Sequence, residues 1–240
     1  MRIIQIENFK PDNMNLLVFT LTLTSTRPIK ESGAQLRGFF ATKFNEYSLL
    51  HQHNADKFIY RYPMVQYKMI NRTPTVIGIN EGAEVLKEIY DEYDKITLNG
   101  NEYEILERGI VYKKEGFGIS EKLIKYEFIT PWFALNQENY RKYLSFDKEK
   151  KTELLNRNLI GNMLSMSKSL GYQVPEKIKC YSELQSRPSS LKGNEIIAFK
   201  GSFITNFLIP DYLGLGKSVS RGFGTVKKWE GSKNKKRSKK

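Results

Sequence analysis

Two histidines separated by one residue are the side chains of this chain best suited to proton transfer. His51 and His53 lie in the segment SLLHQHNADKFIYRY, and the sequence contains no other histidine. In an extended segment this spacing places both rings on one side of the backbone. Because imidazole can donate or accept a proton near neutral pH, the pair could act as general acid and general base. The alternative is a polar loop that contains two solvated histidines.

A metal site explains the pair less well. Zinc would need third and fourth ligands nearby, whereas the one cysteine, Cys180, is far along the sequence and the carboxylates are scattered. The sequence has no HExxH motif, no paired-carboxylate DxD cluster and no serine nucleophile elbow. We therefore predict a site with no metal and no cofactor.

Aromatic and basic residues alternate around and after the histidines. They are Lys57, Tyr60, Arg61, Tyr62, Tyr67 and Lys68. This alternation suits a single-stranded or splayed nucleic acid, because cations contact phosphates and rings stack on unpaired bases. Tyrosines at every second position of a strand are also common as half-buried packing residues, so packing is an alternative for most of these rings.

RNA permits a cleavage reaction for which such side chains suffice. A base removes the proton of a ribose 2′-OH, that oxygen attacks the adjacent phosphate, and an acid protonates the departing 5′-oxygen. Fixed cations stabilise the charge that develops on the phosphate. DNA lacks the attacking hydroxyl, so a site of this kind would select RNA by its chemistry as well as by binding.

A glycine-rich loop near the C-terminus is the second candidate region. It reads GLGKSVSRGFGTVKK over residues 214–228. The GKS fragment does not complete a P-loop, because the first glycine of that motif would fall at Asp211, and a dinucleotide fingerprint would need its third glycine at Val219. Glycines let the backbone present its amides to an anion at close range, and Lys217 and Arg221 add positive charge. We expect a phosphate-bearing ligand larger than a nucleotide.

The composition predicts a globular protein with a polyanionic partner. The chain has 240 residues, 40% of them hydrophobic, and a formal charge of +13. Without the six basic residues of the terminal segment GSKNKKRSKK, 33 basic residues still stand against 26 acidic ones. Such an excess favours nucleic acid over an anionic membrane surface. We interpret residues 231–240 themselves as a solvated, disordered tail.

Several features favour the cytoplasm. The first residues show no apolar core of a signal peptide, and no apolar run approaches the roughly 18 residues that a membrane span needs. A lone cysteine permits no internal disulfide, which fits a reducing compartment. We therefore expect a cytoplasmic protein that does not contact membranes.

The first half of the chain alternates strand and helix patterns. The expected elements are a strand over 14–25, a helix over 31–46, short strands in 57–63, 64–71 and 74–79, a helix over 81–93, and a hairpin over 95–106. Asn80 is the expected N-cap of the second helix, and Asn99-Gly100 the turn of the hairpin. This order is the split βαβ pattern of a ferredoxin-like domain.

The second half predicts a looser copy of the same pattern. We expect a strand over 122–130, a helix over 148–170, strands over 176–184 and 194–208, and a closing strand over 225–229. Its second helix is nearly missing, because Pro210 leaves only DYLGLG before the glycine-rich loop. The fold class is therefore α+β, with two tandem ferredoxin-like (RRM-like, βαββαβ) domains, 1–110 and 111–230, of which the second is irregular.

The quoted regions together resemble a known family. The block LRGFFATKFNEYSLLHQHNADKFIYRYPMVQYKMIN, the segment TVIGINEGAEVL and the glycine-rich GLGKSVSRGFGTV resemble CRISPR-associated endoribonucleases that cut precursor CRISPR RNA within its repeats. The match is to the branch with an HxH motif after the first helix. It covers most of the first half and the final third of the chain.

The resemblance implies roles for individual residues. His51 and His53 would be catalytic, Tyr60 a supporting acid, base or orienting group, and Lys57 a charge stabiliser. The RNA-binding residues would be Gly214, Gly216, Lys217, Ser220, Arg221, Gly222 and Gly224 of the loop, together with Arg61 and Lys68. Cleavage would be metal-independent, at the 3′ side of a repeat stem, and would leave 2′,3′-cyclic phosphate and 5′-OH ends.

The partner implied by the resemblance is the CRISPR repeat RNA of the precursor, in crRNA maturation for antiviral defence. A CRISPR effector complex and a homodimer are further partners that it leaves open. The stretch before Gly214 is too short for the second helix of a complete second domain. The alternative function is therefore a catalytically inactive subunit of an effector complex that binds RNA without cutting it.

Overall fold

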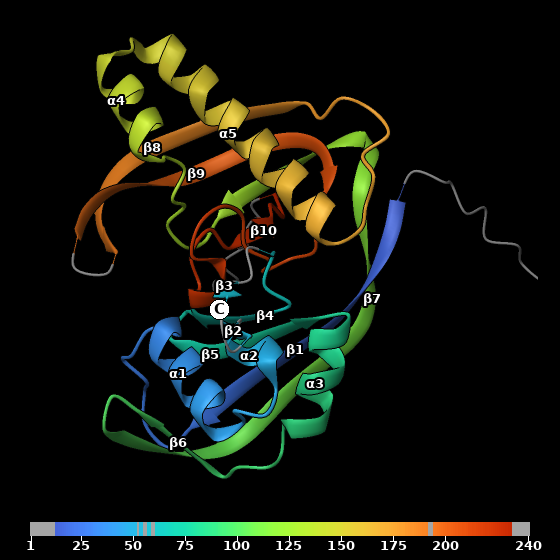
Figure 1. Ribbon diagram of the computed structural model, residues 1–240, viewed down its shortest axis with the longest axis vertical. Helices are drawn as coiled ribbons and strands as arrows, with labels where there is room; N and C mark the ends of the chain where they lie inside the picture. Colours follow the sequence, from blue (N-terminus) through green and yellow to red (C-terminus); the bar gives the residue numbers. More distant parts are fainter. Residues whose placement is uncertain (1–12, 52, 55–56, 59–60, 192–193, 232–240) are drawn as a thin grey trace, which may run out of the picture.

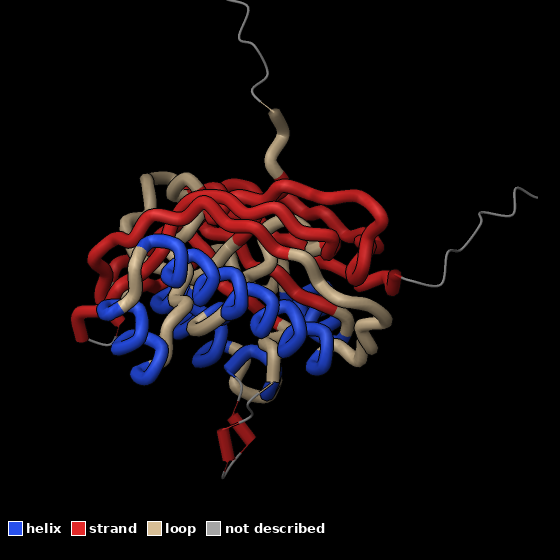
Figure 2. Tube along the Cα trace, turned by 90° about the horizontal axis from the view of Figure 1, so that it is seen from above, coloured by secondary structure: helices blue, strands red, loops and turns tan. Residues whose placement is uncertain are grey.

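Residues 13–51, 53–54, 57–58, 61–191 and 194–231 are described by the computed structural model shown in Figure 1. Most of the strands form one large antiparallel sheet, and the helices lie on one side of it, as Figure 2 shows. Within the described ranges, no helix combines the length and apolar character that crossing a membrane requires.

The first half of the chain forms a βαββαβ unit. Its elements are β1 (Asn13–Ser25), α1 (Gly33–Lys43), α2 (Ser48–His51), β2 (His53–Asn54), β3 (Lys57–Phe58), β4 (Val65–Ile70), β5 (Thr73–Ile79), α3 (Glu81–Ile89) and β6 (Lys95–Leu98). The sheet continues into β7 (Asn101–Phe128), and the strand order is β4-β5-β1-β7. This is the order of a ferredoxin-like domain, with the short β2–β3 pair and α2 inserted between α1 and β4.

The second half repeats the order around the same central strand. After β7 come α4 (Gln137–Ser145), α5 (Lys148–Ser169), β8 (Cys180–Leu191), β9 (Asn194–Leu208), the 3₁₀ helix η1 (Val219–Arg221) and β10 (Val226–Lys228). Strand β9 pairs with β7 on one side and with β8 on the other, while β10 pairs with the end of β7. The predicted α+β fold with two ferredoxin-like units is confirmed, and in the second unit residues 209–225 stand where the other unit has its second helix.

Strand β7 serves both units. It pairs with β1 from Ile105 to Gly118 and with β9 from Gly118 to Glu127, so it closes the first unit and opens the second. The predicted division between residues 110 and 111 falls inside this strand. The two units therefore share one continuous strand, which joins the residues attached to one unit to those of the other.

Local sequence signals account for the elements that lie near the site. Ser32 caps α1 in a capping box with Gln35, and Leu36 and Phe40 face the core. Asn80 stands at the N-cap of α3, but its side chain forms no cap bond; its Oδ1 accepts instead from the amide of Leu17 at 3.0 Å. The predicted N-cap position is thus right, while the side chain joins α3 to β1.

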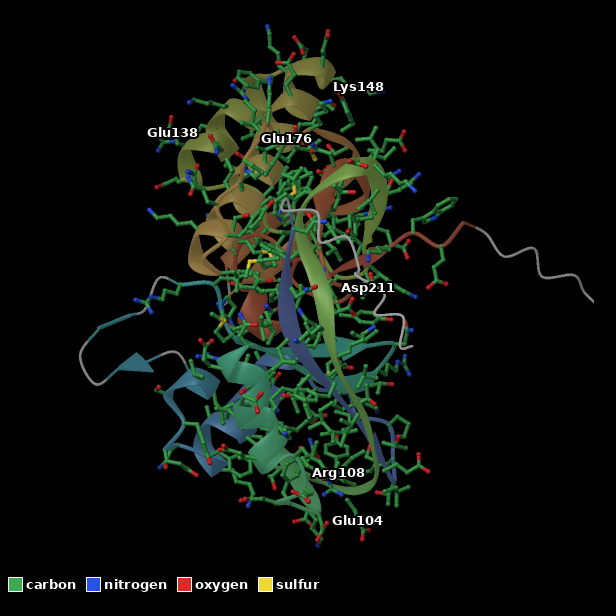
Figure 3. The ribbon with its side chains drawn as sticks, turned by 90° about the vertical axis from the view of Figure 1, so that its right-hand side faces the viewer. Glu104, Arg108, Glu138, Lys148, Glu176 and Asp211 are labelled. Carbon is green, nitrogen blue, oxygen red and sulfur yellow. The ribbon has the colours of Figure 1, made fainter. Side chains whose placement is uncertain are left out.

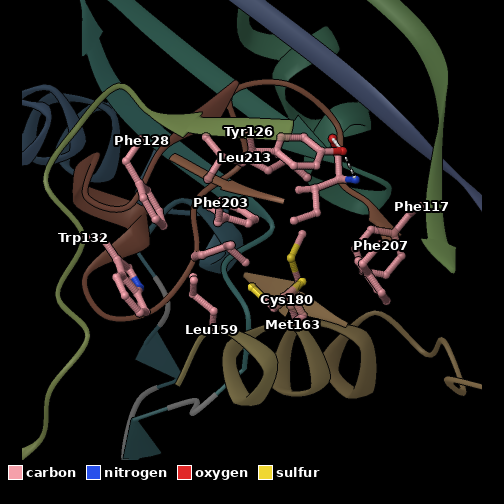
Figure 4. Close-up of a cluster of buried hydrophobic side chains, with 14 of the residues drawn as sticks. Phe117, Tyr126, Phe128, Trp132, Leu159, Met163, Cys180, Phe203, Phe207 and Leu213 are labelled. Carbon is pink, nitrogen blue, oxygen red and sulfur yellow. Dashed lines mark hydrogen bonds between the residues drawn. The ribbon is translucent and has the colours of Figure 1, made fainter. Parts of the chain in front are cut away.

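Two aromatic-rich cores are present: one belongs to the first unit, and the other centres on the second unit but also includes Leu16, Val18, Ile77 and Ile79 of β1 and β5. In the second unit, shown in Figure 4, the ring of Trp132 stacks on Phe128 with centroids 5.3 Å apart, and Met163 of α5 packs into the same cluster. The indole Nε1 of Trp132 donates to Asn162 Oδ1 at 3.0 Å. This core therefore orients a polar residue of α5.

Candidate nucleic-acid interface

The glycine loop, defined here as residues 214–224, packs against the first unit although it belongs to the second. The carbonyl of Arg221 lies against Gly33 at the start of α1, and Gly222 lies against the backbone of Tyr67 in β4. Gly224 has a φ of +64°, and a Cβ there would collide with the carbonyl of Leu215. Only glycine meets both demands at that position, so the loop follows a tight path between the two units.

Strand β4 and the residues before it hold both ends of this loop. Tyr62 donates its hydroxyl to the carbonyl of Gly214 at 2.7 Å, and the amide of Gly214 donates to Gln66 Oε1 at 3.1 Å. At the other end, Lys68 Nζ donates to Thr225 Oγ1 at 3.1 Å. Three side chains of the first unit therefore fix the position of the glycine loop.

Lys68 differs from its predicted role as an RNA-binding residue. It is fully buried, and burial lowers the pKa of its ammonium group to about 7. Thr225, to which it donates, in turn donates to the carbonyl of Gly222 at 3.1 Å. Because the glycine loop covers it, Lys68 does not reach a phosphate at the surface, and we assign it to positioning the loop.

A groove of about 520 Å³ opens beside the glycine loop. It is lined by Arg61, Tyr62, Pro63, Asn162, Ser165, Met166, Ser169, Gly216, Lys217, Ser218, Val219 and Ser220. These residues come from three places: the segment before β4, helix α5 and the glycine loop. The described residues that line it include two cations and several hydroxyl groups but no carboxylate, which is the lining expected of an anion site.

Several of the predicted RNA-binding residues line this groove. Arg61 and Lys217 are exposed on its walls, and Gly216 and Ser220 also line it. Lys217 Nζ lies 3.0 Å from the carbonyl of Leu135. The groove lies at the junction of the units, and Figure 3 shows Glu104 at the far end of the first unit and Glu138 within the second.

Other predicted loop residues act through packing. Arg221 is half-buried, and its Nη2 donates to Ser218 Oγ at 3.0 Å. Burial, and then the nearby charge of Arg221, lower the pKa of Arg37 on α1. Gly214, Gly222 and Gly224 are buried within the loop. Arg221 and these three glycines do not line the groove.

Helix α5 contributes lining residues that the sequence analysis did not identify. Asn162, Ser165 and Ser169 follow one another at helical spacing along the groove. The carboxamide of Asn162 is held by the indole of Trp132, and both groups lie against Gly216. The spacing of polar residues beside the Leu159 and Met163 stripe was visible in the sequence, but it could equally mark a solvated helix face.

The histidine segment, residues 48–60, contacts strand β4 at its start, through Leu50. Helix α2 ends at His51, β2 begins at His53, and the backbone of His53 pairs with that of Phe58 in β3. The carbonyl of Leu50, just before the first histidine, accepts from the buried hydroxyl of Tyr67 at 3.2 Å. Figure 2 shows β2 and β3 beyond the helix layer.

The groove and the histidine segment are joined by a short length of chain. Tyr60 lies outside the described residues, and Arg61 on the groove wall follows it directly. Three residues separate Lys57 at the start of β3 from Arg61, so the four steps between their Cα atoms span at most about 14 Å. Among the described residues, no three histidine, cysteine or carboxylate side chains form a group that could hold a metal ion.

Comparison with protein families gives two adjacent matches. Residues 14–116 match the model of the Cas6b N-terminal domain, and residues 118–229 match that of the Cas6b C-terminal domain. Together the two models cover almost all of the chain, and they meet inside strand β7.

Two solved structures and one curated protein are similar to this chain. A crystal structure of Cas6b is 39% identical, with a TM-score of 0.83, over 90% of this chain and 100% of that one. A crystal structure of the CRISPR RNA processing endoribonuclease Cas6b is 37% identical, with a TM-score of 0.72 and the same coverage. An uncharacterized protein of Methanocaldococcus jannaschii is 47% identical over 133 residues, which are 55% of this chain and 90% of that protein.

Proposed function

The chain belongs to the Cas6b family of CRISPR RNA processing endoribonucleases, and from this membership we propose that it cuts precursor CRISPR RNA within the repeats without a metal ion. The substrate is the CRISPR repeat RNA. A CRISPR effector complex and a second copy of the chain are further proposed partners.

The proposed reaction is an internal transesterification. One histidine of the pair His51 and His53 removes the proton of the 2′-OH, and the 2′-oxygen forms a bond to the adjacent phosphorus. The bond from phosphorus to the 5′-oxygen breaks, and the other histidine gives that oxygen a proton. The products carry a 2′,3′-cyclic phosphate and a 5′-OH. Lys57 stabilises the phosphorane charge, and Tyr60 supports or orients the proton transfer.

The observation that carries the proposal is the position of β4 between the two candidate regions. One face of this strand contacts the carbonyl of Leu50 through Tyr67, and the opposite face holds the glycine loop through Gln66 and Lys68. The start of the histidine segment and the glycine loop are therefore both attached to β4, which supports a reaction between a phosphate held in the groove and the histidines that follow Leu50.

Charge removal in the groove tests where the RNA binds. In a His51→Ala/His53→Ala background, which keeps the RNA intact, Arg61→Gln and Lys217→Gln should each weaken binding of the repeat RNA about tenfold. Because each change removes one phosphate contact, the dependence of log affinity on log salt should also become shallower by about 0.7. Fluorescence anisotropy over a salt series measures both quantities.

The matched control is Lys122→Gln, which removes an exposed charge of β7 that does not line the groove. This variant should keep the affinity for the repeat RNA, and the dependence of log affinity on log salt, close to those of the His51→Ala/His53→Ala protein. Equal behaviour of all three variants would contradict the placement of the RNA in this groove.

A further inference from the structure

The groove beside the glycine loop continues across the surface of the second unit. Lys217 lines both this groove and a second hollow between the start of α4 and β9, which also contains Tyr140, Ile196 and Ile197. A third hollow, of about 650 Å³, shares these last three residues and ends at Arg187 of β8. We name the path from Lys217 past Tyr140 to Arg187 the α4 track.

The chemistry of the α4 track alternates along its length. Lys217 lines one hollow and Arg187 the other, while the ring of Tyr140, 39% exposed, lines both together with Ile196 and Ile197, which we call the apolar floor. Ser186 and Ser189 add hydroxyl groups near Arg187. A single-stranded nucleic acid presents a phosphate, a base and a further phosphate in the same order as the cation, ring and cation of the track. An aromatic face can stack on any base.

The described lining of the track favours RNA over a protein segment. It contains no carboxylate to pair with a basic peptide, and the apolar floor is short and bounded by cations. The track is also continuous with the groove that is proposed to hold repeat RNA. Serine hydroxyls next to a cation can bond a ribose 2′-OH as well as a phosphate.

We propose that the α4 track binds a single-stranded stretch of the repeat RNA that leaves the glycine-loop groove, with one unstacked base on Tyr140 and its flanking phosphates at Lys217 and Arg187. This inference rests on the proposed function. It adds a nucleotide subsite that is separate from the histidine segment, so it contributes to affinity and not to the chemical step.

The test compares Tyr140→Ala, Tyr140→Phe and Arg187→Gln with the wild-type track. Binding is measured in the His51→Ala/His53→Ala background, which keeps the RNA intact, and cleavage is measured with both histidines present. The probes are the repeat RNA and a series of the same RNA shortened by one nucleotide at a time from each end. We expect Tyr140→Ala to weaken binding of the full repeat by about tenfold, because stacking is lost, and Tyr140→Phe to keep the affinity. Arg187→Gln should lower the salt slope by about 0.7.

The shortened RNAs identify the nucleotide in the track. Once that nucleotide is removed, wild type and Tyr140→Ala should bind with equal affinity. Arg141→Gln is the local control, since this exposed arginine is the next residue of α4 but does not line the track. Alanine suits an exposed helix position, so Tyr140→Ala should fold normally.

Cleavage rates at saturating protein separate this inference from the proposed function. The track variants should cut as fast as wild type under these conditions, whereas failure of the proposed function would appear as a wild-type protein that binds and does not cut. Wild-type affinity and salt slope in both Tyr140→Ala and Arg187→Gln, or an equal loss in Arg141→Gln, would overturn the track as an RNA site. The first of these results would point to a protein segment as its occupant.

Discussion

Replacing His51 or His53 by alanine is expected to slow cleavage of the repeat RNA by about 10²–10⁴-fold, with little change in its dissociation constant. In the proposed reaction each histidine moves one proton, and general acid–base help is worth about this much. In the proposed complex the RNA is bound mainly by the groove, whose described lining does not include either histidine. The chemical step should therefore fail while the complex still forms.

Single-turnover kinetics at saturating protein measure the chemical step separately from binding. The matched control is Gln52→Ala, which changes the residue between the two histidines and should cut at the wild-type rate. Wild-type cleavage should depend on pH with a bell shape, and each single histidine variant should lose one limb of it. Cleavage by the double variant at the wild-type rate would remove both histidines from the mechanism.

The Lys68→Met variant is expected to change how stability depends on pH. Burial lowers the pKa of Lys68 to about 7, whereas an unfolded chain keeps the ordinary lysine value of about 10.4. Between these two values the unfolded chain binds a proton that the folded protein has released. The free energy of unfolding of wild type therefore rises with pH across this window. Methionine carries no such proton, so the variant lacks this contribution.

Urea unfolding at several pH values measures the difference between the two proteins. From pH 6 to pH 10 the stability of wild type relative to Lys68→Met should rise by roughly 3–5 kcal/mol, with methionine most favourable at the acidic end. Lys200→Met, a change of an exposed lysine of β9, serves as the control and should give a curve parallel to wild type. Parallel curves for Lys68→Met would show that Lys68 is solvated in the folded protein.

Most elements near the site could be predicted from local patterns. The Asn99-Gly100 turn was predicted correctly because both residues accept positive φ, 49° and 80°, as a tight hairpin requires. The stripe of Leu155, Leu159 and Met163 identified α5 because it faces a core. The closing strand after the glycine loop was also predicted correctly, as β10.

Strand β7 and helix α4 could not be predicted in the same way. The middle of β7 is rich in charge and glycine, and it is extended because β1 and β9 pair with its two edges. Such tertiary pairing overrides local preference. Helix α4 has no buried residue, so it lacks the apolar stripe that marks a helix in a sequence.

Part of the candidate site was also accessible from sequence. Arg61 and Lys217 were predicted as RNA-binding cations because aromatic residues flank the first and glycines flank the second in the sequence. Both line the groove. Lys68 was misjudged because a strand pattern shows which residues share a face but not what covers that face. The contribution of α5 was missed because its serines were indistinguishable from a solvated helix surface.

The central claim, that this chain cuts RNA through the 2′-OH without a metal ion, is tested most directly with two versions of its repeat RNA in the presence of EDTA. One version is all ribose, and the other carries a single 2′-deoxy nucleotide at the mapped cut site. We predict cleavage of the all-ribose strand alone, with a 2′,3′-cyclic phosphate on the upstream product. Cleavage of both strands, or no cleavage of a tightly bound all-ribose strand, would contradict the proposed mechanism.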